Sequence, residues 1–247
     1  MNGFMDGVIR CSRYAFGPNR LHYCGPDANR EILSYINESE SDPGLRQLLR
    51  EFETMFPYLR HIADATGIAD PFDERVVEAY WLGNELLEMI DTRAFYRHLV
   101  EGQRIKDKLG VKTFNLVAEK VGQGAVPHHS FHVFDIWKRS GHTNHEHTPE
   151  FMDECRVGWG TVLATDGPTI SVSTEPLIMV HGKYVLGNPI ERKLARRLEA
   201  EYDIEQIKPG DVVSIHWGVP CEVINKHQAD MLKKYTLRHI HLANQTV

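Results

Sequence analysis

Residues 209–235 read PGDVVSIHWGVPCEVINKHQADMLKKY, and this stretch predicts how the second half of the chain folds. Pro209, Gly210 and Asp211 are turn residues. They precede an apolar run over 212–217 that has the composition of a strand. From about residue 226 to 242 the apolar residues recur at helical spacing. The stretch therefore predicts a turn, a strand and a terminal helix in that order.

More strands are expected on the N-terminal side of this stretch. Residues 155–165 (CRVGWGTVLAT) and 169–174 (TISVST) have strand composition and are separated by the turn sequence Asp-Gly-Pro. PLIMV and KYVLG predict two further short strands on either side of residues 181–182, whereas residues 191–202 (ERKLARRLEAEY) predict a charged helix. Short strands with regular turns, followed by a helix, predict a small OB-like β-barrel with a C-terminal helix over 149–247.

The first half of the chain has helical periodicity instead. Apolar residues over 45–62 recur every three or four positions, with Asp42-Pro43 at the start of the predicted helix, Pro57 as a kink or break, and Gly67 at the end. A second helix is expected from about residue 71 to 90 and a third from 92 to about 109. We therefore predict an α+β protein with an α-helical domain over 1–148 and a barrel domain over 149–247.

Composition excludes several classes of protein. Of 247 residues, 42 % are hydrophobic and 25 % charged, which is typical of a globular chain. The formal net charge of −6 argues against nonspecific nucleic-acid binding. The sequence has neither an apolar run of membrane-spanning length nor a signal-peptide core, so we expect a cytoplasmic protein with no membrane association. Because the cytoplasm is reducing, we expect the four cysteines to be free thiols. Phosphate-loop, dinucleotide-binding, nucleophile-elbow and H-E-x-x-H motifs are absent from the sequence.

Two groups of residues in the second half resemble the HypC/HupF/HoxL family of [NiFe]-hydrogenase maturation chaperones. The first is the ordered series Cys155, Gly160, Val162, Asp166 and Gly167. The second begins with a Gly-Asp turn (Gly210 and Asp211), continues as an apolar strand that ends in His-x-Gly (His216 and Gly218), and is followed by Val-Ile-Asn. The last three residues are Val223, Ile224 and Asn225. The resemblance covers about residues 155–242, and it implies a small OB-like barrel followed by a helix.

The resemblance also implies a function. In that family the leading cysteine and the strand histidine hold iron that carries CO and cyanide, together with a HypD-like partner, and the iron passes to the hydrogenase large subunit. Carried over, Cys155 is the thiolate ligand and His216 its companion. A soft thiolate with an imidazole suits such iron chemically. The family cysteine stands at the N-terminus, whereas Cys155 follows some 150 residues here.

Histidines form a second signal, because six of the 14 in the chain lie between residues 128 and 147. His128, His129 and His132 follow Pro127 in a segment rich in aromatic residues. On a helix, His128 and His132 share a face and can bind one metal, whereas on a strand they share a face with Ser130. The aromatic neighbours favour ordinary packing, in which the buried histidines need hydrogen-bond partners but no metal. The polar stretch that contains His142, His145 and His147 is expected to be the linker between the domains.

The first half therefore supports an alternative function. Together with Cys24, which lies next to a predicted helix start, the three histidines at 128–132 are candidate ligands for a metal or haem in an enzyme, one that could make the diatomic ligand. The sequence leaves open whether the protein is an enzyme. A purely structural role for both domains is the third possibility.

Overall fold

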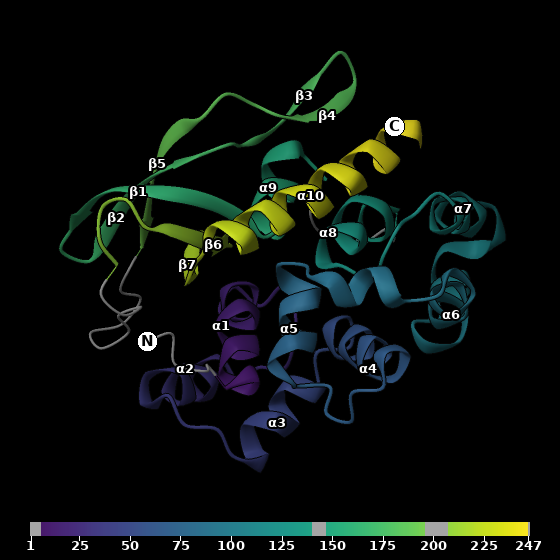
Figure 1. Ribbon diagram of the computed structural model, residues 1–247, viewed down its shortest axis with the longest axis horizontal. Helices are drawn as coiled ribbons and strands as arrows, with labels where there is room; N and C mark the ends of the chain where they lie inside the picture. Colours follow the sequence, from purple (N-terminus) through teal and green to yellow (C-terminus); the bar gives the residue numbers. More distant parts are fainter. Residues whose placement is uncertain (1–5, 140–146, 196–206, 247) are drawn as a thin grey trace.

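The computed structural model describes residues 6–139, 147–195 and 207–246, and its fold class is α+β, as predicted. Figure 1 shows the helices of the first half on one side, the sheet on the other, and the C-terminal helix crossing between them. The helical part consists of α1 (Gly7–Asn19), α2 (Asn29–Glu38), α3 (Pro43–Arg50), α4 (Met55–Thr66), α5 (Glu74–Trp81), η1 (Glu85–Met89), α6 (Thr92–Arg97), η2 (His98–Gly102), α7 (Ile105–Gly122), α8 (His129–Phe131), η3 (His132–Ile136) and η4 (Trp137–Arg139). None of the described helices is long and apolar enough to cross a membrane.

The second part contains the strands and two flanking helices. They are α9 (Pro149–Cys155), β1 (Gly158–Asp166), β2 (Thr169–Thr174), β3 (Leu177–Val180), β4 (Lys183–Leu186), β5 (Ile190–Ala195), β6 (Val212–His216), β7 (Val219–Ile224), α10 (Lys226–Ala243) and η5 (Asn244–Thr246). The predicted strands β2, β3, β4 and β6 and the terminal helix α10 are confirmed. The segment before β1 differs, because Cys155 ends a helix and does not begin the strand.

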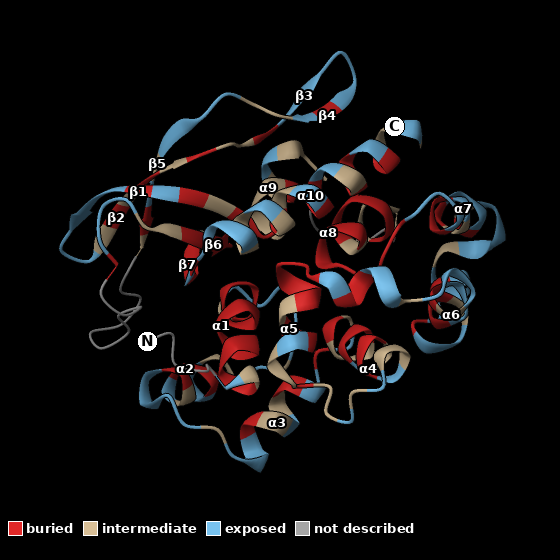
Figure 2. Ribbon diagram, viewed as in Figure 1, coloured by how far each residue is buried: buried red, intermediate tan, exposed pale blue. Residues whose placement is uncertain are grey.

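The sheet is antiparallel throughout, with strand order β5-β2-β1-β6-β7. The edge strands β5 and β7 approach within 8 Å, so the sheet is curled. Among the described residues no ladder of hydrogen bonds joins these two strands, and the sheet is therefore open where a closed barrel was expected. β3 and β4 form a separate hairpin that projects from the body and is largely exposed (Figure 2).

The helix predicted over 191–202 is wrong for its first residues. Residues 190–195 form β5, which pairs with β2 along its whole length, and Leu194 is buried in the core opposite Ile170. The charged residues favour a helix locally, but the edge of β2 supplies hydrogen bonds that override this propensity. The rest of the predicted helix, over 196–202, lies outside the described residues. So do His142 and His145 in the predicted linker.

Capping side chains explain where several helices begin. Asp6, Asp42, Asp73 and Asp91 each accept hydrogen bonds from backbone N–H groups in the first turn of α1, α3, α5 and α6. Asn225 and Gln228 form a reciprocal capping box at the start of α10. The break in the 45–62 pattern falls at 51–54 rather than at Pro57, which lies in the first turn of α4, where proline is tolerated.

Helix α1 connects the two parts of the molecule. Every residue from Val8 to Asn19 is buried, because α2, α3 and α5 cover one side of the helix and β6 and β7 the other. In Figure 2 it is coloured almost entirely as buried and lies beside α5. The main hydrophobic core accordingly runs without interruption from helical residues such as Ile9 and Tyr80 to strand residues such as Val213 and Val219. The division into domains at residue 148 remains a prediction, and the two parts share one core.

Candidate functional site

Cys155 and His216 are brought together, although they lie 61 residues apart in the sequence. Cys155 is the last residue of α9, and His216 is the last residue of β6. The turn after β6 has positive φ at both Trp217 and Gly218, as a tight two-residue hairpin requires, and the Trp217 N–H donates to the Glu154 carbonyl (3.0 Å). The turn is thereby fixed against the end of α9. His216 Nε2 lies 2.9 Å from the carbonyl oxygen of Cys155.

His129 joins this pair from the helical half. Its Nε2 lies 2.8 Å from the same Cys155 oxygen, and its Nδ1 lies 3.1 Å from the hydroxyl of Tyr80. One neutral tautomer satisfies both contacts: Nε2–H donates to the Cys155 carbonyl, and Nδ1 accepts from the Tyr80 hydroxyl. We assign this tautomer from the hydrogen-bond network. The Cys155 carbonyl therefore has a donor that does not depend on His216.

A proline in α1 decides which nitrogen of His216 carries the proton. Pro18 has no N–H to donate to the carbonyl of Tyr14 four residues earlier, and His216 Nδ1 lies 2.7 Å from that oxygen. A neutral imidazole donates through one nitrogen only. The Cys155 carbonyl accepts from His129 in either tautomer of His216, whereas the Tyr14 carbonyl has lost its helical donor, so the network assigns Nδ1–H to His216, which donates it to Tyr14. The Nε2 lone pair of His216 then lies beside Cys155.

Burial keeps both imidazoles neutral. It lowers the pKa of His216 to about 4, against a smaller opposing effect of the two carbonyl contacts. Burial lowers the pKa of His129 well below its ordinary value, and the nearby His216 ring adds to this effect. The indole of Trp81 covers both rings, at centroid distances of 4.6 Å from His129 and 5.4 Å from His216. The site therefore holds two buried, neutral imidazoles.

The thiols at this site are protonated. Burial raises the pKa of the Cys155 thiol far above its ordinary range, and the neighbouring Cys24 thiol raises it further. Cys24 lies in the segment after α1, where the ring of Tyr23 stacks on Trp217 at 4.4 Å and meets Phe151 edge-on at 5.3 Å. Cys24 is thus close enough to Cys155 to affect the pKa of that thiol. Desolvation of the sulfur raises the pKa of Cys24 to about 12, although the residue as a whole is exposed.

The three histidines at 128–132 point to three different places. His128 Nδ1 lies 2.7 Å from the Ser130 hydroxyl, which also lies 2.7 Å from His239 Nδ1 on α10. His129 meets Cys155, as described above. His132 packs edge-on against Tyr58 at a centroid distance of 5.9 Å. His128 is the N-cap of α8 and has an extended backbone, whereas His132 lies beyond α8 in helical conformation, so the two are not successive residues on one helix face.

Among the residues that the structure describes, no group of three or more His, Cys, Asp or Glu side chains is arranged to hold a metal ion. Cys221 is a buried residue of β7, and its sulfur lies 3.6 Å from the Val219 carbonyl. His239 and His241 are both on α10, but only His239 is buried. The contacts that do meet at this point are therefore those of His216 and His129 with the Cys155 carbonyl, with the Cys24 thiol near Cys155.

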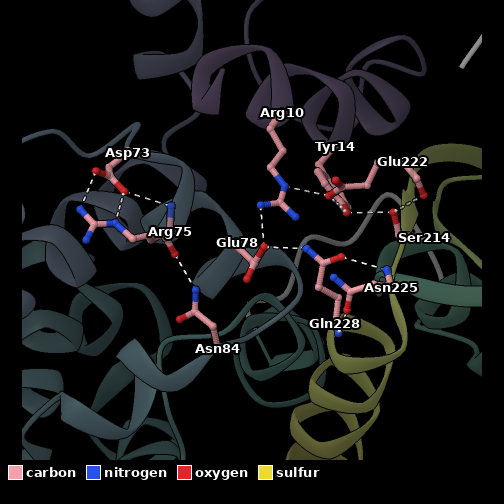
Figure 3. A network of polar contacts seen from close by, with 10 residues as sticks. All are labelled: Arg10, Tyr14, Asp73, Arg75, Glu78, Asn84, Ser214, Glu222, Asn225 and Gln228. Carbon is pink, nitrogen blue, oxygen red and sulfur yellow. Dashed lines mark hydrogen bonds and ion pairs between the residues drawn. The ribbon is translucent and has the colours of Figure 1, made fainter. Parts of the chain in front are cut away.

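A buried polar network holds α1 in the position that orients His216. The Tyr14 hydroxyl donates to Glu222 Oε1 (2.6 Å) and lies 2.8 Å from the Ser214 hydroxyl. Arg10 bridges Glu222 at 2.8 Å and Glu78 at 2.7 Å. Figure 3 shows these side chains meeting from α1, α5, β6 and β7. Tyr14 thus contacts the sheet through its hydroxyl and His216 through its carbonyl.

Sequence reasoning missed Tyr14, Tyr80 and Trp81, which position the histidines. Pro18 inside a helical segment was the available signal, because a proline leaves the carbonyl four residues earlier without its usual donor. Nothing in the sequence identifies His216 as the donor that replaces it, since 202 residues separate the two contact positions.

Comparison with known proteins gives one match. A model described as a family of unknown function, DUF6390, matches residues 3–247. No curated protein and no solved structure matches the chain.

Proposed function

The chain belongs to the family of unknown function DUF6390, and we propose that it is an accessory protein of [NiFe]-hydrogenase maturation. In this proposal the centre at Cys155 and His216 binds an iron fragment that carries CO and cyanide. The fragment is cargo, destined for a hydrogenase large subunit or exchanged with a HypD-like maturation factor. The proposal rests on the resemblance of residues 155–167 and 210–225 to the HypC/HupF/HoxL family, and on the geometry at His216.

The observation that carries the proposal is the orientation of His216. Imidazoles that bind metals usually donate their second nitrogen to a backbone carbonyl or a carboxylate, which fixes the ring and leaves the other lone pair for the metal. The Nδ1 contact with the Tyr14 carbonyl, at 2.7 Å, is an arrangement of this kind. The Nε2 lone pair faces the Cys155 carbonyl oxygen at 2.9 Å, an unfavourable contact that a metal centre would relieve.

Cys155 supplies the second donor. A thiolate and an imidazole suit low-spin iron with strong-field ligands. An iron fragment that brings its own diatomic ligands needs fewer donors from the protein than a bare ion does. Because the thiol of Cys155 is protonated before binding, the incoming iron replaces its proton.

Partners reach this centre by a different route from that in the HypC-like proteins. There the cysteine is at the free N-terminus, whereas Cys155 ends a helix inside the chain and is half-buried. The solvent side of the site carries Tyr23, whose ring is 39 % exposed and stacks on Trp217. We infer that transfer to a partner takes place past Tyr23 and Cys24.

Infrared absorption tests the proposal. The full chain is produced anaerobically in cells whose maturation factors load a hydrogenase, and the purified protein is examined in the region where metal-bound CO and cyanide absorb. We expect bands in the wild-type protein and none in Cys155→Ala. His216→Asn keeps a donor near the Nδ1 position but lacks Nε2, so we expect it to lose most of the bands. Cys11→Ala is the matched control, because it removes a buried thiol that lies against Met55 in the helical core.

Two results would overturn the proposal: a wild-type protein without bands, or bands that persist in Cys155→Ala. Metal or haem colour that remains in Cys155→Ala and disappears in His129→Ala would support the alternative, an enzyme with its site in the helical half. The infrared and metal measurements on the same samples distinguish these outcomes.

A further inference from the structure

Two segments of the helical half repeat one pattern of residue types. Residues 60–65 read RHIADA, and residues 97–102 read RHLVEG. Each has arginine, histidine, two apolar residues, an acid and a small residue in that order. The first segment lies in α4, and the second runs from the end of α6 into the π-helical turn η2. The proposed function uses neither of them.

The two segments face each other across one pocket of about 280 Å³. From each segment the arginine, the histidine, the acid and the small residue all line this pocket, and Ala94 completes the lining. The rings of His61 and His98 stack in parallel, with centroids 4.4 Å apart and an interplanar angle of 9°. The repeated pattern therefore gives the pocket two similar walls.

The small residues make room for this arrangement. A Cβ atom added at Gly102 would lie 2.6 Å from His98 Nδ1, a distance at which the ring would have to move. The π-helical turn at 98–102 also widens the helix locally, and such turns are frequent at functional sites. A larger residue at position 102 would displace His98 from its stack on His61.

The histidines contribute polar atoms without charge. Burial lowers the pKa of His61 to about 4 and that of His98 to about 3, so both rings are neutral at physiological pH. His98 is only 8 % exposed, and its Nε2 has no hydrogen-bond partner among the described residues. A buried polar atom without a partner needs an explanation, and a ligand or an ordered water molecule is the usual one.

The four charged side chains of the pocket are all exposed to solvent. Within the described part of the chain, the structure gives no ion pair or side-chain hydrogen bond to any of the four: Arg60, Asp64, Arg97 and Glu101. Each wall thus offers one guanidinium and one carboxylate. Two positive and two negative groups leave the pocket with no net charge, which disfavours both a bare cation and a simple anion.

We propose that this pocket binds a small zwitterion, of the chemical class of a free α-amino acid. A guanidinium recognises a carboxylate through two parallel hydrogen bonds, and the acids on the walls recognise an ammonium group. The neutral stacked imidazoles supply a flat, polar floor. The volume is just below the range of about 300–1,000 Å³ that holds drug-sized ligands, so it suits a molecule of amino-acid size.

Isothermal titration of the full chain with each proteinogenic L-amino acid tests this proposal. We expect at least one to bind, and to bind at least about tenfold more tightly than propionate or propylamine, each of which lacks one charged group. Arg97→Ala and Glu101→Gln should each weaken binding by about tenfold or more. Arg93→Ala is the matched control, because this exposed arginine lies one turn earlier on α6 and does not line the pocket.

Several results would overturn the zwitterion site. The first is that no amino acid binds, or that propionate binds as tightly as an amino acid does. The second is that heat of binding appears only with inorganic phosphate or Zn²⁺. The third is that Arg97→Ala and Glu101→Gln bind amino acids as Arg93→Ala does. The infrared experiment on Cys155 is independent of all of these, so each proposal can fail without the other.

Discussion

Replacing Tyr14 with phenylalanine removes one hydroxyl from the boundary between the helices and the sheet. That hydroxyl is fully buried and donates to Glu222 Oε1 at 2.6 Å, with the Ser214 hydroxyl at 2.8 Å (Figure 3). The ring of Tyr14, which stacks on Trp81 at 5.2 Å, is retained in the variant. The substitution therefore tests the hydrogen bonds without opening a large cavity.

The expected loss follows from the partners that remain. A hydrogen bond to a charged group contributes about 1.5–3 kcal/mol net. Glu222 keeps its ion pair with Arg10 at 2.8 Å, and Ser214 keeps the Glu222 carbonyl at 3.4 Å, so neither group is left without a partner. We therefore expect Tyr14→Phe to lower the free energy of unfolding by about 2 kcal/mol. For a chain of this size that corresponds to a fall in Tm of about 4–8 °C.

Urea unfolding followed by far-UV circular dichroism measures this loss, with Tyr35→Phe as the control. Tyr35 also contacts a carboxylate, that of Asp42, but it does so at the surface, so its loss should be much smaller. Because one core spans both halves, we expect a single unfolding transition in the wild type and in both variants. Equal losses in the two variants, or a separate transition for the sheet, would refute the view that this network fastens the halves together.

Three further predictions concern the buried histidines and the thiol. Ser130→Ala leaves two buried imidazoles without their shared hydroxyl, so unfolding free energy should fall by about 2–4 kcal/mol in urea titrations, and an unchanged midpoint would contradict this. His98, His128 and His216 have pKa values of about 3, 3 and 4, below the ordinary 6.5, so the unfolded chain binds more protons below pH 6.5. The free energy of unfolding should therefore fall as the pH drops from 6.5 towards 4, by about 1.4 kcal/mol per pH unit for each of these histidines. A free energy of unfolding that does not change over this pH range would show that the rings are not buried as neutral groups. Because iron must replace the proton of Cys155, iron loading should rise by up to about tenfold per pH unit near neutrality, and loading independent of pH would exclude this thiol as a ligand.

Local signals predicted much of the fold. Asp42-Pro43 and Gly67 bound the 45–62 pattern as expected, and the turn residues between β1 and β2 lie in the loop. Pairing partners are not local signals. Residues 191–195 have the composition of a helix, and only the neighbouring edge of β2 makes them a strand. The same limit applies to the open sheet, because closure depends on the relation between β5 and β7 rather than on either sequence.

The candidate site shows the same division between local and distant information. The resemblance paired Cys155 with His216, and the structure places the His216 ring 2.9 Å from the Cys155 carbonyl. It did not reveal that this contact is to the backbone, or that His129 shares it. The spacing of His128 and His132 suggested a common ligand position, which a continuous α-helix would have provided. His128 does not belong to the helix, however: it is the N-cap of α8, with extended backbone, and its side chain accepts from the Ser130 N–H.

The helical half is therefore part of the site and not only a carrier for the sheet. His216 could take either neutral tautomer if the sheet stood alone, and its Nε2 proton would then satisfy the Cys155 carbonyl. The helices favour the other tautomer: Pro18 leaves the Tyr14 carbonyl in need of a donor, whereas the Cys155 carbonyl accepts from His129 in either case. His216 then donates Nδ1–H to Tyr14, and its Nε2 lone pair lies beside the Cys155 carbonyl. A HypC-like barrel without these helices would lack this constraint, so the two halves of the chain must act together for His216 to serve as a ligand.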